Sequence, residues 1–209
     1  MKKIIIAIDS FKGCLTSAEA GKAAEKGIKS INPFCHTSVI PIADGGEGLL
    51  DVLITATKGK YITLSAHGPL MKMAKTHYGL SGNGRTAIIE MAAISGLPLV
   101  PIEQRNPMLT TTFGTGELIK DALNKGCRNF IIGIGGSATN DAGLGMLQAL
   151  GFRFLDKSGH TLGTGGQIME AVANIDTSGI HPALRETHFM VACDVANPFY
   201  GPDGAAYIL

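Results

Sequence analysis

A chain of 209 residues is long enough to bury a sizeable core, as one domain or as two small ones. Hydrophobic residues make up 45% and charged residues 17%, which excludes a disordered protein, and a net charge of +1 gives no electrostatic basis for binding nucleic acid or an anionic membrane. No apolar stretch reaches the ~18 residues of a membrane helix, and the early apolar run is too short for the core of a signal peptide. The four cysteines are scattered, as is typical of reduced thiols, so we expect a cytoplasmic protein.

The chain begins with the pattern of a small α/β unit. Residues 4–8 form a continuous run of mostly β-branched side chains, which predicts a strand buried on both faces. Thr16 and Glu19 have the spacing of a capping box, in which each side chain accepts from the other residue's backbone amide. They predict a helix that begins there and runs to about residue 30.

A second strand is predicted over residues 38–42, and a helix that begins near residue 49 follows it. Pro41 cannot donate a ladder hydrogen bond, so it favours an edge strand or a bulge. We place a boundary between a first lobe, residues 1–59, and a second lobe, residues 60–209, because the pattern changes there. Two strands and two helices are too few to bury a core, so the first lobe is expected to be incomplete.

The second lobe opens with three strand-like pieces separated by glycine-containing turns. This spacing predicts an antiparallel meander over residues 61–91. Helix and strand patterns then alternate, as helix 118–124, strand 130–132, helix 144–150, strand 152–155 and strand 189–193. Such alternation predicts an α/β fold of two lobes, with mainly parallel sheets and flanking helices.

The stretch from residue 127 to 151 joins a predicted strand, a glycine-rich turn and a helix. Glycines in such a turn let a ligand approach the backbone, and the amides at the start of the helix favour an anion such as phosphate. The alternative is a bare turn with one capping residue, but four polar side chains follow the glycines and one cap needs only one of them. We therefore predict a cofactor-binding loop that consists of Gly135, Gly136, Ser137, Thr139 and Asn140.

Three predicted strands end in an aspartate, namely Asp9, Asp44 and Asp194. The carboxyl ends of strands form the ligand crevice of open α/β sheets, although aspartate also suits ordinary turns. Carboxylates beside phosphate loops are what phosphoryl transfer requires, as Mg²⁺ ligands or as the base that takes the acceptor proton. Lys12 is the basic residue of these loops, and a solvated surface lysine is the equally good alternative.

The sequence has no P-loop motif and no protein-kinase motif set. A nicotinamide-dinucleotide oxidoreductase is an alternative, since Gly133, Gly135 and Ala138 fit the dinucleotide fingerprint and Asp156 follows about 20 residues later. Each of these matches, taken alone, is weak evidence for a dinucleotide-binding site. This alternative also leaves the glycine-rich loop at 43–48 and the other strand-end carboxylates without a function.

Five long motifs carry a resemblance to a known family: 9–12 (DSFK), 43–48 (ADGGEG), 112–117 (TFGTGE), 132–141 (IGIGGSATND) and 192–198 (ACDVANP). In this order they resemble the bacterial glycerate kinases that phosphorylate the 2-hydroxyl of D-glycerate. The resemblance covers the whole chain. It implies ATP-dependent phosphorylation of glycerate with Mg²⁺, in a two-lobed α/β fold, and a homodimer is a possible assembly.

The individual roles rest mainly on the strand-end argument. We expect Asp44 and Asp194 at the reacting centre, with Asp9 and Lys12 in support, and Asp194 with Asp141 as Mg²⁺ ligands. Which carboxylate is the base and which hydroxyl accepts the phosphoryl group stay open. The expected substrate contacts are Ser10, Gly45, Gly46, Glu47, Thr112 and Gly114.

The resemblance also implies a longer protein. Members of the family continue beyond the position of Leu209 through a glycine-rich segment and a part that returns to the first lobe. We therefore expect an exposed apolar sheet edge in the first lobe of this chain, a truncated second lobe, weak or absent activity and a tendency to associate. A nucleotide-binding fragment without catalysis is the corresponding alternative.

Overall fold

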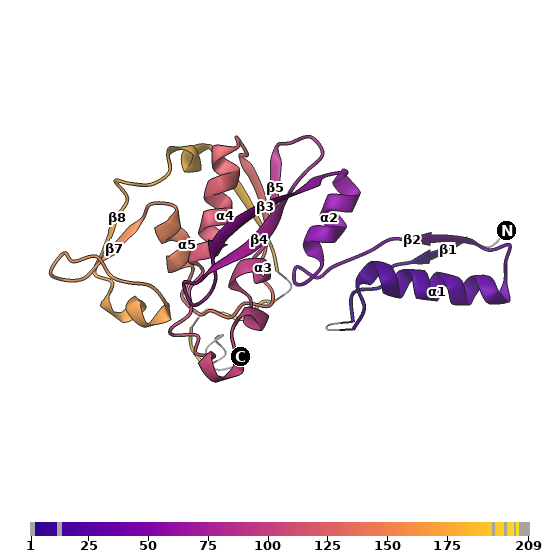
Figure 1. The fold of residues 1–209 in the computed structure, drawn as a ribbon, viewed down its shortest axis with the longest axis horizontal. Coiled ribbons are helices and arrows are strands. Elements are labelled where there is room, and N and C mark those ends of the chain that lie inside the picture. Colours follow the sequence, from indigo (N-terminus) through magenta and orange to yellow (C-terminus); the bar gives the residue numbers. More distant parts are fainter. Residues whose placement is uncertain (1–2, 12–13, 194, 199, 203, 205–209) are drawn as a thin grey trace.

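A computed structural model describes residues 3–11, 14–193, 195–198, 200–202 and 204 (Figure 1). Two of the predicted catalytic residues, Lys12 and Asp194, lie outside the described residues. The described strands form a two-stranded N-terminal sheet, a five-stranded central sheet and a second two-stranded sheet. The predicted α/β fold is confirmed. No helix in these described ranges is long and apolar enough to cross a membrane.

The N-terminal unit lies apart from the rest of the molecule (Figure 1) and consists of β1 (Lys3–Ile6), α1 (Ser17–Ile31) and β2 (His36–Val39). Its two strands pair in parallel, as a crossover through a helix allows. The predicted capping box is present: Thr16 N donates to Glu19 Oε2 at 2.9 Å, and Glu19 N donates to Thr16 Oγ1 at 3.2 Å. Strand β2 ends before Pro41, so the strand predicted over 38–42 lies about two residues too late.

Helix α1 covers only one face of the β1–β2 sheet. The packing is close, because a Cβ atom added at Gly21 would lie 2.4 Å from Val39 Cγ1. On the other face Ile5 is 60% exposed, so the prediction of a strand buried on both faces was wrong. The exposed apolar sheet edge expected for the first lobe stays a prediction, and what the structure shows is exposed apolar surface on this face of the unit. Besides Ile5, it includes the exposed side chains of Ile40 and Ile42 beyond the ladder.

The central sheet has the order β3-β4-β5-β6-β9. Strands β3 (Lys60–His67), β4 (Met73–Leu80) and β5 (Thr86–Glu90) form the predicted antiparallel meander. Strands β6 (Asn129–Gly133) and β9 (His188–Ala192) extend it in parallel with β5. The carboxyl ends of β5, β6 and β9 therefore meet at one edge, where ligands of α/β sheets bind.

Helices α2 (Leu49–Thr57) and α4 (Phe113–Asn124) cover opposite faces of this sheet. Ile88 packs with Leu50 and Ile54 of α2, whereas its neighbour Ile89 belongs to the larger core that includes Leu118. Consecutive strand residues point to opposite faces, which explains the division. Helix α2 thus packs on the central sheet, although the expected boundary near residue 59 assigned it to the first lobe.

Of the remaining elements, β7 (Arg153–Leu155) and β8 (Asn174–Asp176) lie on the side away from the N-terminal unit (Figure 1). These two strands pair with each other rather than with the central sheet. The shorter helices are α3 (Ala92–Ser95), α5 (Leu144–Ala149) and the 3₁₀ turns Leu97–Leu99, Ile102–Gln104, Gly166–Ala171 and Pro182–Glu186. Helix α4 begins five residues earlier than predicted, so most of the threonine- and glycine-rich stretch at 112–117 is helical.

Candidate functional site

The glycine-rich loop at 43–48 packs directly against the carboxyl ends of β6 and β9. A Cβ atom at Gly133 would lie 2.5 Å from the carbonyl oxygen of Gly45, and one at Gly45 would lie 2.7 Å from the carbonyl oxygen of Ala192. A Cβ atom added at Gly135 would likewise lie 2.7 Å from the Cα atom of Gly46. Each of these three glycines has room for a hydrogen atom but not for a side chain. The structure thus brings together two of the loops that the sequence singled out.

This packing places Asp44 and Glu47 at the edge of the sheet with their side chains exposed. Asp44 Oδ1 accepts from the backbone amide of Gly46 at 2.9 Å. Its second oxygen has no hydrogen-bond donor among the described residues and is free to bind a ligand. Ala192, the last residue of β9, lies against this loop two positions before Asp194.

The turn of the predicted cofactor loop offers free amides. Gly136 has a positive φ of 72°, and the backbone amide of Thr139 donates to Ser137 Oγ at 3.0 Å. Within the described ranges, the amides of Gly136 and Ser137 have no hydrogen-bond acceptor. Two adjacent free amides in a turn are a common binding site for phosphate oxygens. Asn140, the last residue of this predicted set, is half-buried.

The start of α5 does not offer the free amides expected there. Asp141 is 1% exposed and accepts from the amides of Gly143 at 3.0 Å and Gly145 at 3.2 Å. The amide of Met146 donates to Thr112 Oγ1 at 2.9 Å. The expectation that the amides of this helix face a ligand was therefore wrong, because protein side chains occupy them. The role of Asp141 as a metal ligand stays a prediction, and both of its oxygens already accept protein hydrogen bonds.

Thr112 and Gly114 lie inside the second lobe. The backbone amide of Thr112 donates to Asp141 Oδ2 at 2.8 Å, and the residue is 5% exposed. A Cβ atom at Gly114 would lie 1.9 Å from the carbonyl oxygen of His67, so glycine is needed there for helix-to-strand packing. Their role as substrate contacts stays a prediction that this burial does not support.

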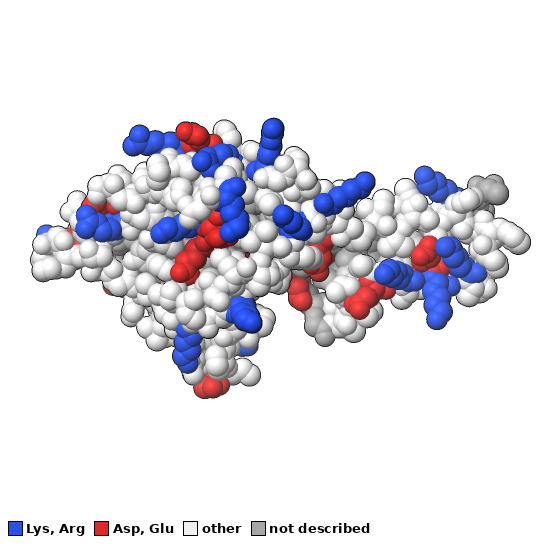
Figure 2. Space-filling model, turned by 45° about the horizontal axis from the view of Figure 1, so that its top comes forward, with Lys and Arg blue, Asp and Glu red and all other residues white. Residues whose placement is uncertain are grey.

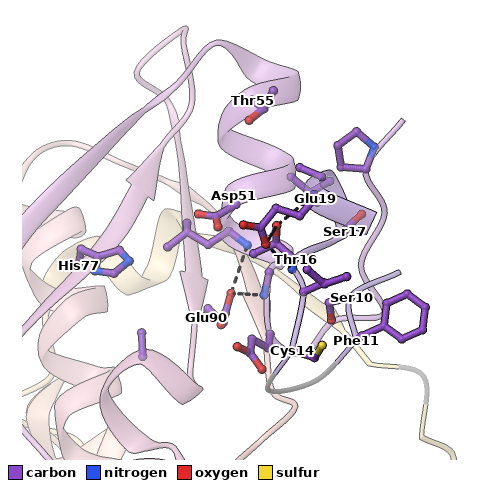
Figure 3. A pocket seen from close by; sticks show the side chains of 18 residues that line it. Ser10, Phe11, Cys14, Thr16, Ser17, Glu19, Asp51, Thr55, His77 and Glu90 are labelled. Carbon is purple, nitrogen blue, oxygen red and sulfur yellow. Dashed lines mark hydrogen bonds between the residues drawn. The ribbon is translucent and has the colours of Figure 1, made fainter. Parts of the chain in front are cut away.

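A cavity of about 510 Å³ lies between the N-terminal unit and the central sheet (Figure 3). The start of α1 and the loop before it form one wall, and α2 with the end of β5 forms the other. Of the predicted substrate contacts, Ser10 and Glu47 line it. Asp9 does not line the cavity, but its Oδ1 accepts from the amide of Ser10 at 2.6 Å and so shapes the wall.

Glu90 is a cavity residue that the sequence analysis missed. It ends β5, and its Oε2 accepts from the amides of Gly48 at 3.2 Å and Leu50 at 3.3 Å. Burial raises the pKa of Glu90, the two amide hydrogen bonds oppose that rise, and the carboxylates of Asp51 and Glu47 add to it. The strand-end rule that selected the three aspartates applies equally to this glutamate.

The surroundings of the cavity are acidic. On the face shown in Figure 2, acidic side chains lie on both sides of the constriction between the N-terminal unit and the larger part. No Lys or Arg lines the cavity in the part of the chain that the structure describes. This local charge favours a ligand that brings its own cations over a bare anion.

The comparison with known proteins decides the family. A sequence profile of the glycerate kinase family matches residues 4–209. This chain belongs to the glycerate kinase family. It is 53% identical over 206 residues to the glycerate kinase of Bacillus subtilis (strain 168), and 49% identical over 206 residues to the glycerate 2-kinase of Escherichia coli (strain K12). Each alignment covers 99% of this chain and 54% of the relative, so the chain spans about half of their length.

The glycerate kinase fold is also found in a solved structure. A crystal structure from Salmonella typhimurium LT2, described provisionally as glycerate kinase 2, superimposes with a TM-score of 0.87 at 48% identity. The match covers 100% of this chain and 56% of that one. The sequence resemblance to the glycerate kinases is thereby confirmed.

The geometry also removes the basis of the nicotinamide alternative. A dinucleotide fold needs the strand that ends in the acidic residue to lie beside β6, but β7 pairs with β8 in a separate sheet. The carboxylate of Asp156 instead accepts from the backbone amides of Ser158 at 2.8 Å and His160 at 2.9 Å. It is therefore a turn residue.

Proposed function

We propose that this chain forms the ligand crevice of a kinase that transfers the terminal phosphoryl group of ATP to a hydroxyl of D-glycerate. The expected product is 2-phosphoglycerate. The observation that carries this proposal is the family match over residues 4–209, with relatives named glycerate kinase. The contact between the 43–48 loop and the carboxyl ends of β6 and β9 supports it, because it gathers carboxylates and free amides at one edge of the sheet.

We assign the phosphate groups of ATP to the glycine-rich turn. The free amides of Gly136 and Ser137 are the expected donors, and Gly135 places this turn beside the 43–48 loop. Thr139 and Asn140 follow the turn with half-buried polar side chains and complete the proposed set. Backbone amides hold phosphate oxygens without adding a charge that must be desolvated.

Glycerate is assigned to the cavity between the N-terminal unit and the central sheet, which Glu47 of the 43–48 loop lines. Ser10 and Glu47 line the cavity. Gly45 and Gly46 directly precede Glu47 in the chain and are the proposed backbone contacts. The acidic side chains around the cavity repel the carboxylate of glycerate, so a cation must accompany the substrate. Lys12 is the proposed protein cation.

Asp44 and Asp194 are the proposed carboxylates of the reacting centre. The substrate hydroxyl oxygen attacks the terminal phosphorus, ADP leaves, and one of the two carboxylates takes the hydroxyl proton. No group of three or more His, Cys, Asp or Glu residues suited to a metal occurs in the described part of the chain. The donor chemistry still fits Mg²⁺, which is commonly held by one or two carboxylates together with water and phosphate oxygens. When bound, Mg²⁺ supplies charge neutralisation at the phosphates.

A coupled ADP-release assay with D-glycerate tests this proposal, and ³¹P NMR of the product identifies the acceptor hydroxyl. Glycerate-dependent ADP release in the presence of Mg²⁺ is the expected result. Calorimetric titration separates the alternatives: ATP binding without turnover indicates a non-catalytic nucleotide-binding fragment, and tight NADH binding without ATP binding overturns the proposal. A cytoplasmic location and a homodimer remain predictions for the same protein.

A further inference from the structure

The segment that carries Asp44 and Glu47 crosses from the N-terminal unit to the central sheet. The ladder between β1 and β2 ends at the pair Ile6 and Val39, and one more hydrogen bond follows, from Ile40 N to Ile6 O at 2.8 Å. Beyond that point the sheet no longer aligns the two chain segments. Other groups must therefore place the loops that carry the candidate carboxylates.

Ser17 continues the connection beyond the sheet. This residue is the first of α1 and is 7% exposed. Its Oγ donates to the carbonyl of Ile8 at 2.7 Å and accepts from the amide of Ile42 at 3.0 Å. Ile8 directly precedes Asp9, and Ile42 lies two residues before Asp44. One buried hydroxyl thus joins the two loops that follow β1 and β2.

Glu90 holds the other end of the same segment. Helix α2 has Gly48 at its N-cap position, with a positive φ of 92° and no side-chain cap of its own. The Glu90 carboxylate from β5 replaces that cap, because its Oε2 accepts from the amides of Gly48 and Leu50 (Figure 3). The segment is therefore anchored to the N-terminal unit at residue 42 and to the central sheet at residues 48 and 50.

We propose that Ser17 and Glu90 are positioning residues, which hold the 42–48 segment between the two parts of the molecule and so place Asp44 and Glu47 for phosphoryl transfer. This inference rests on the proposed kinase function. A displacement of about 1 Å in a reacting group can lower a rate by about 10²-fold, so loss of either anchor should reduce kcat. The KM for ATP should change little, because neither residue contacts the 135–140 turn.

The test compares truncating with conservative variants in the complete protein. Ser17→Ala removes both hydrogen bonds, whereas Ser17→Thr keeps the hydroxyl. Glu90→Ala removes the cap, whereas Glu90→Gln keeps an oxygen that accepts from an amide but removes the charge. The alanine variants should lower kcat by about 10-fold or more, and the conservative variants should restore most of it.

Two matched controls separate positioning from a general loss of stability. Ser30 is also a serine of α1 whose hydroxyl donates to a backbone carbonyl, that of Gly27, at 2.7 Å. Glu117 is also a carboxylate that accepts from a backbone amide, that of His67, at 2.7 Å. Ser30→Ala and Glu117→Ala should leave kcat near the wild-type value, even if they lower the unfolding temperature.

Amide hydrogen exchange gives a readout that does not depend on activity. The amides of Ile42, Gly48 and Leu50 should be protected in the wild-type protein. Ser17→Ala should release Ile42 alone, and Glu90→Ala should release the other two. Unprotected amides in the wild type overturn the inference, even if a variant fails to fold.

Two kinetic results also overturn the inference. One is a wild-type kcat in a folded alanine variant. The other is a Glu90→Gln variant as impaired as Glu90→Ala, because the charge and not the placement would then matter. Absence of wild-type turnover would instead refute the kinase function, and amide exchange would still decide whether the two anchors exist.

Discussion

The close contact between β6 and the 43–48 loop predicts a large effect of one added methyl group. In Gly133→Ala the new Cβ atom would lie 2.5 Å from the carbonyl oxygen of Gly45 and 2.6 Å from Leu49 Cδ2. Moving that oxygen to an ordinary contact distance of 3.4 Å needs a shift of about 0.9 Å. A rotation of the Leu49 side chain can relieve the second contact, but the carbonyl of Gly45 is backbone and no side-chain rotation can move it. The loop that carries Asp44 must therefore move away from the sheet.

Gly133→Ala should therefore change both the turnover number and the free energy of unfolding. A shift of this size should lower kcat by about 10- to 10²-fold, and overpacking should cost about 1–3 kcal/mol in the free energy of unfolding. The ADP-release assay measures the first quantity, and denaturant unfolding measures the second. Gly163→Ala is the matched control, because no atom lies within 4 Å of its added Cβ. A Gly133→Ala protein with wild-type kcat and stability would refute the close packing of the two loops.

Four further outcomes are expected. Asp44→Asn and Asp194→Asn should each lower kcat by about 10²-fold or more while thermal unfolding is unchanged, and near-normal turnover would make both of them turn residues. Thr16→Ala should lose the capping box and about 1 kcal/mol of stability in urea unfolding; an unchanged midpoint would contradict this. The amide and side chain of Ser178 and then Arg153 lower the pKa of Asp176 from 3.8 to about 2. Its contribution to stability is therefore present above pH 3.8 and lost as the pH falls towards 2, and Asp176→Asn should abolish that dependence in acid unfolding scans. Finally, the exposed face around Ile5 should make the 209-residue chain associate in light scattering, and Ile5→Lys should reduce the association; a monodisperse wild-type chain would contradict the prediction.

Local patterns predicted the elements well where one interaction determines them. The capping box placed the start of α1, because Thr16 and Glu19 need only each other. The glycine after α5 marked its end, since Gly151 adopts a positive φ of 101° that other residues rarely adopt. Predictions that depended on the neighbouring element were less accurate. The strand predicted over residues 4–8 is β1 (Lys3–Ile6), and it is exposed on one face, because burial is decided by what packs on the strand and not by its own side chains.

In the candidate site, too, local patterns predicted some features, and contacts between distant segments decided the others. Motif order was sufficient to indicate the glycerate kinase family, and the strand-end rule selected Asp44 beside the glycine-rich turn. It could not show that Thr112 occupies the amide of Met146 in α5 or that its own amide holds Asp141, because these contacts join residues 34 and 29 positions apart. It also missed Glu90, whose partners Gly48 and Leu50 are 42 and 40 positions away.

The sequence by itself therefore determined the family, the α/β class and which loops are the candidates for the chemistry. These properties depend on residue types at short spacing, such as glycines in turns and carboxylates after strands. Only the tertiary structure decided how the loops meet, which amides are occupied by protein side chains and what anchors the segment with Asp44. Those features depend on contacts of Gly133 with Gly45 and of Ser17 with Ile42, which form only when distant segments pack. Close packing leaves room for one arrangement of such segments, and no local pattern encodes it.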